Sequence, residues 1–490
     1  MRARLLLLAG ALAAFGASLG SGFHFDDYAI FQDAALTSAR GWLDVWTLRQ
    51  TRPLTYLSFW LNYQIGGRDP VGYHLLNLAL HAGCVLLGYE CLRRLLPKRA
   101  ALLAAAIFAV HPIQAEAVNY VWGRSIVLAT LLALAAWLCW ITGRWWAAVA
   151  CFAAALLAKE EVAAFPLVLV VMGMEVVGET EKRPDETGRG RQEGPLHVTI
   201  AMLLLSLAAG ARVIYATAVT PGAPAGLQAP ISASRYLLTQ GPVILRYLRL
   251  LLIPYGFTID PEIRVPAVWE GVAAWLAIVG AIVLALRRRT AWSCWLLAGF
   301  ILLIPSSSLF PAADLAADRR MYFPLLAFAA AIGILLERVR RPAIAICAAT
   351  ALTLASVART QVWMTEESLW QEAVERAPEK VRPKIQLARA LPAPHALEVL
   401  AQARTLAPGD PAVAAETGKT LLAAGRPEAA LQEFGRALAL DPRDPRNLNN
   451  RGVALAAMGQ TEAARADFER ALSLDPSLAE ARANLQKLAR

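Results

Sequence analysis

The stretch that decides the fold is "LLLLAGALAAFGASLGSGFHFDDYAIFQDA", residues 5–34. Its first half is a continuous apolar run, which predicts a membrane-spanning helix. Its second half carries two adjacent carboxylates, Asp26 and Asp27, at the mouth of that helix. Charged side chains are costly at such a place, and two neighbouring like charges also raise a pKa. A catalytic or binding role for the pair is therefore the first hypothesis.

The composition of the chain indicates a polytopic membrane protein. Of its 490 residues, 57% are hydrophobic and only 18% are charged, with a mean hydropathy of +0.44. The net charge of +10 does not indicate nucleic-acid binding, because Lys and Arg cluster in short loops between apolar runs, as the positive-inside rule describes. All six cysteines lie within apolar runs and form no CxxC pair. This pattern predicts buried free thiols rather than disulfides or metal ligands.

Eleven apolar segments are candidate membrane spans, and several are shorter than the ~20 residues that a bilayer needs. The Arg2 and Arg4 flank places the N-terminus in the cytoplasm, and therefore Asp26 and Asp27 outside. A cleaved signal peptide is the alternative for the first segment, but the segment lacks a clear A-x-A site and more spans follow it. The candidate spans are residues 5–21, 73–91, 100–116, 124–142, 145–158, 160–177, 196–216, 267–286, 291–305, 322–337 and 343–357.

The basic loops agree with this topology on one condition. Residues 235–266 must not cross the membrane, because Arg287–Arg289 would otherwise lie outside. Arg246 and Arg249 lie in the middle of that segment, which predicts an interfacial or re-entrant helix on the outer face. The odd number of spans then places the C-terminus outside. The predicted cytoplasmic charges are Arg93, Arg94, Lys98, Arg99, Lys182, Arg183, Arg189, Arg191, Arg287–Arg289, Arg338, Arg340 and Arg341.

A second unit begins near residue 360, where Ala, Glu, Arg and Leu replace the apolar runs. Pro408, Pro442 and Pro476 recur at intervals of 34 residues, which is the period of the tetratricopeptide (TPR) repeat. Small and aromatic residues keep that spacing too: Gly418, Ala430, Phe434 and Ala437 correspond to Gly452, Ala464, Phe468 and Ala471. We expect the small residues where the two helices of a repeat cross, with the aromatic filling the gap to the next repeat.

The predicted fold is therefore all-α, with a transmembrane bundle over residues 1–358 and a TPR domain over residues 359–490. A degenerate repeat over residues 379–408 precedes the two regular ones, and "SLAEARANLQKLAR" reads as a terminal capping helix. Arrays of this kind present a concave groove to peptides or proteins. A purely structural appendage is the alternative interpretation.

Polar residues gather at the predicted outer face. A carboxylate there can act as general base on an acceptor hydroxyl, and arginines can hold the phosphate of a lipid-linked donor through bidentate hydrogen bonds. Simpler roles are also open, because His111 could cap a helix end and Arg246 and Arg249 could snorkel to headgroups. The acidic pair could also hold a divalent cation such as Mg or Mn, but no full ligand set is apparent.

Seven long segments then carry a resemblance. They are "FDDYAI", "TRPLTYLSFWLNYQIGGRDPVGYHLLNLALHA", "FAVHPIQAEAVNYVWGRSIVLA", "LAKEEV", "RYLRLLLIP", "LFPAADLAADRRMYFPLLAF" and "WMTEESLWQEAVERAP". In this order they resemble the transmembrane-and-tetratricopeptide-repeat (TMTC-like) O-mannosyltransferases, within the GT-C class of polyprenyl-phosphate-sugar glycosyltransferases. The resemblance runs through nearly the whole chain, although the family members usually have longer repeat arrays.

The resemblance implies a GT-C-type bundle that moves a sugar, mannose in the family, from a polyprenyl-phosphate donor to an acceptor hydroxyl with inversion. It implies that Asp26 or Asp27 is the base. It also implies a donor site on the outer face. The repeat domain offers the acceptor a groove, which favours a protein acceptor. The Ala, Arg and Leu content suggests a bacterial inner membrane with a periplasmic site. The residues expected to bind the donor phosphate or sugar are Arg246, Arg249, Arg319, His111, Glu116 and Arg124.

Two other classes of function remain open at this point. In the first, the protein is a non-catalytic scaffold, with helices that anchor it and repeats that recruit partners. In the second, it is a transporter, although transporters usually show internal membrane repeats and broken helices near the midplane. The scaffold predicts that Asp26→Asn is silent, whereas an enzyme predicts lost turnover with normal folding.

Overall fold

The computed structural model describes residues 1–180, 196–220, 225–288, 290–339 and 341–488. Within these ranges the chain is helical and contains no strand. It divides into two compact units, Met1–Thr365 and Glu366–Arg490. The predicted boundary after residue 358 falls inside the last helix of the first unit, which continues to Val362. The predicted basic residues Lys182, Arg183, Arg189, Arg191, Arg289 and Arg340 lie outside the described residues.

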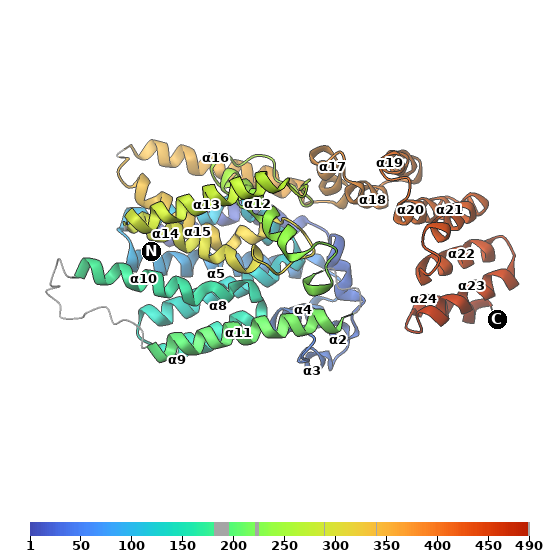
Figure 1. Cartoon of the computed structure of the whole chain (residues 1–490), viewed down its shortest axis with the longest axis horizontal. Coiled ribbons are helices and arrows are strands. Elements are labelled where there is room, and N and C mark those ends of the chain that lie inside the picture. Colours follow the sequence, from blue (N-terminus) through green and yellow to red (C-terminus); the bar gives the residue numbers. More distant parts are fainter. Residues whose placement is uncertain (181–195, 221–224, 289, 340, 489–490) are drawn as a thin grey trace. The chain divides into compact units, whose positions relative to one another are not determined.

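Helices occupy all eleven segments predicted to span the membrane (Figure 1). They are α1 (Arg2–Phe15), α5 (Pro70–Leu95), α6 (Lys98–Val110), α8 (Arg124–Ile141), α9 (Trp145–Ala158), α10 (Phe165–Thr180), α11 (Leu196–Val219), α13 (Val268–Arg288), α14 (Ala291–Leu303), α15 (Tyr322–Leu336) and α16 (Pro342–Val362). Shorter elements join them: η1 (Gly16–Gly20), η2 (Phe25–Phe31), α2 (Ala34–Thr37), α3 (Gly41–Asp44), α4 (Pro53–Gly66), η3 (Pro112–Gln114), α7 (Ala115–Asn119), η4 (Val121–Gly123), η5 (Glu160–Ala164), η6 (Gly226–Gln228), α12 (Ala233–Leu252), η7 (Ile304–Ser306) and η8 (Asp318–Met321).

The first unit is a multi-pass membrane bundle. Among the described residues, seven helices are long and apolar enough to cross a bilayer, and an eighth is added if Lys98–Val110 and Pro112–Asn119 form one span bent by 47°. The apolar helices Trp145–Ala158 and Ala291–Ser306 are shorter. At 1.5 Å per residue, a 14-residue helix covers only about 21 Å of a ~30 Å hydrocarbon core. Length alone therefore supports fewer spans than the eleven that were predicted.

Helix α15 lies at the centre of the bundle. It is apolar all round, and its residues from Tyr322 to Ala331 are all buried, as expected for a helix without a solvent face. It packs closely against α6 at Gly333, where a Cβ would lie only 2.6 Å from the carbonyl oxygen of Ala100. The six cysteines are unpaired as predicted, but only Cys84 and Cys91 are buried, and Cys347 is exposed on α16.

The polar ends of the helices meet on one side of the bundle, as the topology predicted. The segment after α1 contacts the end of α16 through His24 and Trp363, and it contacts the start of α8 through Asp27 and Trp122. The loop before α15 meets the segment after α6 through Arg319 and Glu116. One face therefore collects side chains from segments that are far apart in the sequence.

Helix α12 covers the first part of the predicted interfacial segment, residues 235–266, and ends at Leu252. This helix is amphipathic, with Tyr236, Val243, Tyr247 and Leu250 on its buried side, and it is not among the helices that qualify as spans. It packs against α13 through Gly241, where a Cβ would lie 3.1 Å from Trp275. Its interfacial position in a membrane stays a prediction.

The second unit consists of paired antiparallel helices, with the repeats where the 34-residue period places them. A Cβ on Gly418 would lie 2.7 Å from the ring of Phe434, and one on Gly452 would lie 2.6 Å from the ring of Phe468. Phe434 also packs in a cluster with Ala454 of the next repeat. The predicted roles of the small and aromatic positions are thus confirmed. The helices are α17 (Glu366–Arg376), α18 (Val381–Ala390), α19 (Ala393–Leu406), α20 (Pro411–Ala423), α21 (Pro427–Leu440), α22 (Pro445–Ala457), α23 (Thr461–Leu474) and α24 (Ala479–Leu488).

Candidate active site

The acidic pair lies on η2, and the short turn separates its two side chains. Asp27 is fully buried, and its Oδ1 accepts a hydrogen bond from the backbone N–H of Trp122 at 2.8 Å. Its Oδ2 accepts from the backbone N–H of His24 at 3.0 Å. Asp26 is exposed, and its backbone N–H donates to the Tyr120 hydroxyl at 3.3 Å. One carboxylate is therefore fixed inside the protein, and its neighbour faces outward.

The backbone before the pair is strained. Phe25 has a φ of +45°, the one positive φ of a non-glycine residue in the described part of the chain. Such strained backbone is concentrated at functional sites, because the surrounding structure must hold it in place. Here the two hydrogen bonds to Asp27 hold the turn.

Burial also changes the acidity of Asp27. Desolvation raises the pKa of its carboxyl to about 8, and the backbone N–H groups of His24 and Trp122 oppose this shift. A group with that pKa is largely protonated near neutral pH, so it is a poor general base there. The exposed Asp26 is then the carboxylate of the pair that is suited to accept a proton from a substrate.

The end of α16 supports the acidic turn from behind. The His24 ring donates from Nε2 to the carbonyl oxygen of Trp363 at 2.7 Å. The rings of Tyr120 and Trp363 lie 5.6 Å apart, and Asn119 donates to the hydroxyl of Thr360 at 3.1 Å. The last turn of α16 is thus part of the site's framework.

Two arginines form ion pairs with carboxylates beside the acidic turn. The backbone N–H of Arg319 donates to Glu116 Oε2 at 3.0 Å, and its guanidinium bonds Glu116 Oε1 and Asp314. Arg246 on α12 donates to Asp318 Oδ1 at 2.6 Å. Arg246, Arg319 and Glu116, three of the residues predicted to bind the donor, thus lie close together, because Asp318 and Arg319 are neighbours in the chain. The side chains of Glu116 and Asp318 are both buried.

Tyr120 links this cluster to the acidic pair. Burial raises the pKa of its hydroxyl well above the usual value, the nearby Asp27 and Asp26 raise it further, and Arg319 lowers it. Tyr120 therefore lies within electrostatic range of both the carboxylates and the arginine.

The structure does not bring the other three predicted residues into contact with an open site. Arg249 is exposed and donates to the carbonyl oxygen of Tyr255 at 3.2 Å. His111 is buried, and its Nδ1 accepts from the N–H of Ile113 while its Nε2 donates to the carbonyl oxygen of Leu251, both at 3.1 Å. His111 thus caps a helix end, which was one of its two predicted roles.

Arg124 is a buried structural cation. Its Nε donates to Asn77 Oδ1 at 2.8 Å, its Nη2 to the Tyr73 carbonyl at 3.0 Å, and its Nη1 to the Ser58 carbonyl at 3.2 Å. The guanidinium also lies 4.7 Å from the centroid of the Phe59 ring. With all three nitrogens engaged and no exposed surface, this side chain connects α8 with α4 and α5.

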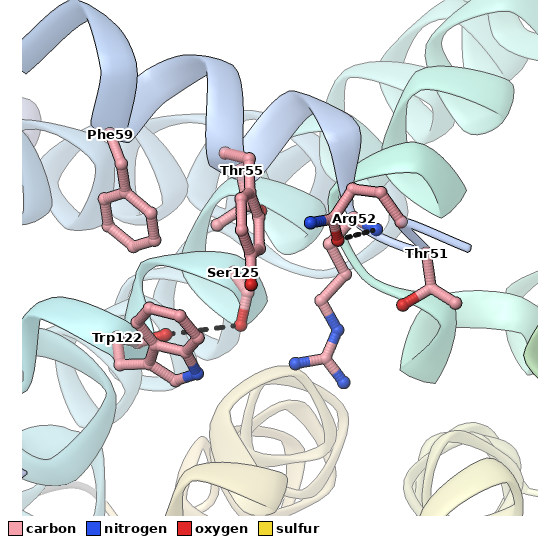
Figure 2. A pocket seen from close by; sticks show the side chains of 8 residues that line it. Thr51, Arg52, Thr55, Phe59, Trp122 and Ser125 are labelled. Atoms are coloured by element: carbon pink, nitrogen blue, oxygen red, sulfur yellow. Dashed lines mark hydrogen bonds between the residues drawn. The ribbon is translucent and has the colours of Figure 1, made fainter. Parts of the chain in front are cut away.

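Arg52, at the start of α4, was not singled out from the sequence, although it lies in the quoted "TRPLT" motif. Its guanidinium forms a two-point ion pair with Glu160, at 2.6 and 3.1 Å. Beside it is a pocket of about 110 Å³, the Arg52 pocket, whose wall includes Phe59 and Trp122 (Figure 2). Since the N–H of Trp122 binds Asp27, this pocket adjoins the acidic turn.

Lys159, the residue before Glu160, is a second cation of the site. Its side chain is 3% exposed, and its Nζ lies 3.0 Å from Glu161 Oε1. Burial lowers the pKa of its ammonium to about 8, Glu161 opposes that shift, and Arg52 and Arg319 lower the pKa further. Lys159 therefore joins the Arg52 pair electrostatically to Arg319.

The site offers a divalent cation few ligands. In the described parts of the chain, no three His, Cys, Asp or Glu side chains are grouped closely enough to hold a metal ion. Both Asp27 oxygens already accept backbone hydrogen bonds inside the protein, whereas Mg²⁺ and Mn²⁺ favour six oxygen ligands. These residues do not fit a resident Mg or Mn ion.

Comparison with known proteins finds similar proteins for both parts of the chain. Family models described as "Tetratricopeptide repeat" and "TPR repeat" match residues 445–478 and 418–459. Protein O-mannosyl-transferase TMTC3 of Mus musculus is 46% identical over 87 residues, which are 18% of this chain and 10% of that protein. Protein O-mannosyl-transferase TMTC4 of Homo sapiens is 26% identical over 462 residues, covering 77% of this chain and 62% of that protein.

The chain spans less than two thirds of the length of these relatives. Among solved structures, ArnT from Cupriavidus metallidurans bound to undecaprenyl phosphate superposes with a TM-score of 0.43 and 14% identity, covering 95% of this chain and 79% of that one. The sequence similarity to TMTC4 extends through most of the bundle, and the repeat models match the second unit. The chain is therefore similar over most of its length to a protein O-mannosyl-transferase, and its second unit matches the tetratricopeptide repeat.

Proposed function

We propose that this protein is an integral membrane glycosyltransferase of GT-C type. It transfers a sugar, mannose in the first instance, from a polyprenyl-phosphate-linked donor to a hydroxyl of an acceptor. The observation that carries the proposal is the pairing of exposed Asp26 with buried Asp27 on one strained turn. That turn lies at the bundle face that also holds Arg319 and Arg246.

In this proposal Asp26 is the general base and Asp27 is a positioning residue. Asp26 accepts the proton of the acceptor hydroxyl as the oxygen attacks C1 of the sugar. The bond between C1 and the phosphate oxygen breaks on the opposite side, so the configuration at C1 inverts and polyprenyl phosphate leaves. Asp27 keeps the turn in shape through its bonds to Trp122 and His24.

The arginines stabilise the negative charge of the leaving phosphate. Arg319 is oriented by Glu116 and Asp314. Arg246 retains one buried nitrogen, Nη2, without a hydrogen-bond partner among the described residues. Unsatisfied buried donors are costly, and a phosphate oxygen would satisfy this one. His111 and Arg124 are structural residues of the bundle. Arg249 contacts the headgroups at the bilayer surface and not the donor.

We further propose that the acceptor is a protein held by the repeat groove, on the periplasmic side of a bacterial inner membrane. The bacterial location is proposed from the Ala, Arg and Leu content alone, and two features support the protein acceptor. The regular repeats are of a kind that binds peptides or proteins. The first unit also ends at the site: Trp363, three residues before the repeat unit begins, bonds His24.

The test is sugar transfer by the purified full chain in lipid nanodiscs, from radiolabelled polyprenyl-phosphate mannose to protein acceptors. Asp26→Asn is compared with Asp44→Asn, an exposed carboxylate of the same outer segment. We expect the first change to lower transfer about a hundredfold or more and the second to leave it unchanged. Equal transfer by both variants, or no transfer from any polyprenyl-phosphate sugar, would favour the scaffold.

A further inference from the structure

A groove between α9 and α11 combines an apolar wall with a polar, cationic end, as a site for a lipid phosphate would. It encloses about 240 Å³ and its apolar wall includes Ala153 and Leu156 of α9 and Leu205 and Ala209 of α11. The small side chains leave room between two helices that otherwise pack against each other. At one end the lining becomes polar, with Thr51, Glu160 and Arg212.

Arg212 is the unusual residue of this groove, because it lies inside a helix that qualifies as a membrane span. Its Nε donates to the Leu48 carbonyl at 3.3 Å, and its Nη2 donates to the carbonyls of Thr47, at 2.7 Å, and Gln50. It forms no ion pair with any described carboxylate, and its Nη1 has no partner there. An uncompensated cation in a spanning helix is a functional candidate by default.

The groove is connected with the candidate active site. Thr51 lines both the groove and the Arg52 pocket, and Glu160 of the groove is the ion-pair partner of Arg52. Figure 2 shows Thr51 beside Arg52, with Trp122 on the other side of the pocket. A molecule with its tail in the groove thus has its polar end directed past Thr51, toward the residue that binds Asp27.

We propose that the groove between α9 and α11 binds the isoprenoid tail of a polyprenyl phosphate, with Arg212 Nη1 donating to its phosphate. The inference rests on the proposed function and makes it specific, because it adds Arg212 to Arg319 and Arg246 as a ligand of the donor's phosphate and gives the tail a place beside it. A phosphate supplies the negative charge that Arg212 lacks, and guanidinium–phosphate hydrogen bonds are strong when shielded from water. The apolar wall contacts the tail within the bilayer.

The test uses the full chain in phosphatidylcholine nanodiscs and a farnesyl phosphate probe that carries a photoreactive diazirine on its tail. We expect cross-links to peptides containing residues 153–157 and 205–213. An excess of undecaprenyl phosphate should remove them, while inorganic phosphate and undecaprenol should not. Cross-links elsewhere, or labelling that undecaprenyl phosphate does not compete, would overturn the proposal and leave a bulk phospholipid as the occupant.

Matched variants separate the groove from general effects on folding. Ala209→Trp fills the groove, whereas Ala211→Trp places the same side chain on an exposed position of the same helix. We expect the first to reduce labelling about tenfold and the second to leave it unchanged. Because added bulk can destabilise a packed site, the thermal stability of both variants is measured alongside. Arg212→Gln should reduce labelling by a similar factor, while Arg144→Gln, an exposed arginine after α8, should not.

The two proposals fail in different ways. Labelling of the groove without transfer from any polyprenyl-phosphate sugar would overturn the proposed function and keep the binding site. Transfer that depends on Asp26 but is indifferent to Ala209→Trp and Arg212→Gln would overturn the groove and keep the enzyme.

Discussion

The backbone N–H of Trp122 lies 2.8 Å from Oδ1 of Asp27 and donates a hydrogen bond to it, which ties the first outer segment to the start of α8. Through this contact, a residue 95 positions away in the chain decides which member of the acidic pair is buried. The two aspartates therefore have different chemical roles although they are neighbours, and the difference can be measured.

Substituting the two aspartates should have separable effects. Asp26→Asn should abolish transfer at unchanged thermal stability, because its side chain is exposed. Asp27→Asn should also lower the free energy of unfolding of the turn, by about 1–3 kcal/mol, because an amide nitrogen would then face a backbone N–H. Transfer assays and thermal unfolding of both purified variants check this. Equal stability losses would contradict the assignment.

The stability of the acidic turn should depend on pH. Burial raises the pKa of Asp27 from its unfolded value of 3.8 to about 8, so the folded state binds a proton more tightly than the unfolded state. The stabilisation is then complete below pH 3.8 and is lost as pH rises through about 8. Hydrogen exchange of residues 21–31 should become faster between pH 5 and pH 8, after correction for intrinsic exchange. Asp27→Asn should remove that dependence, and an unchanged slope in the variant would contradict the prediction.

Arg246 and Arg249 should respond differently to the same substitution. Arg246→Gln leaves the buried Asp318 carboxylate without its ion-pair partner, which should cost about 3 kcal/mol and reduce transfer. Arg249→Gln changes an exposed side chain that bonds one carbonyl, and its effect should stay within about 0.5 kcal/mol. Thermal unfolding and transfer rates test both. Similar losses for the two variants would show that they act together, as the sequence first indicated.

The repeat unit offers a matched pair of glycine substitutions. Gly452→Ala should destabilise this unit by about 1–3 kcal/mol, because the new Cβ would lie 2.6 Å from the Phe468 ring. Gly435→Ala is the control: no atom lies within 4 Å of its Cβ position, and alanine favours a helix by about 0.5–1 kcal/mol. Limited proteolysis of the full chain should show faster cleavage within residues 445–474 in the first variant only.

Removing divalent cations should leave transfer unchanged. Asp27 uses both oxygens on backbone N–H groups, and the site provides no three-residue ligand group in the described chain. The transfer rate is measured with and without excess EDTA, followed by addition of Mg²⁺ or Mn²⁺. A rate lost with EDTA and restored by the metal would show that the acidic pair is a ligand after all.

The architecture could be predicted because its signals are periodic and long. The 34-residue spacing gave the positions of Gly418 and Phe434, and the charge of the loops placed Asp27, Glu116 and Arg319 on one face. The number of spans was harder to predict. Apolar composition indicates where a helix lies, but the length of that helix depends on where the chain turns. The predicted boundary after residue 358 lies within α16, which continues to Val362.

The details of the site could not be predicted, because they depend on side-chain direction. Sequence gives no sign that Asp27 turns inward and Asp26 outward, since both lie on a short 3-10 turn whose hydrogen-bond donors come from Trp122 and His24. Arginine is a common phosphate ligand, but the guanidinium of Arg124 already donates to the carbonyls of Ser58 and Tyr73 and to Asn77. Arg52 lies in a quoted motif, yet its ion pair with Glu160 joins segments 108 residues apart.

The hydrogen bond from His24 to the Trp363 carbonyl makes the turn that holds Asp27 depend on the end of α16. Trp363 directly follows α16 and lies three residues before the repeat unit begins at Glu366. A change that moves this carbonyl would therefore also move His24, whose backbone N–H donates to Asp27. The geometry of the acidic turn is thus set in part from the C-terminal end of the bundle.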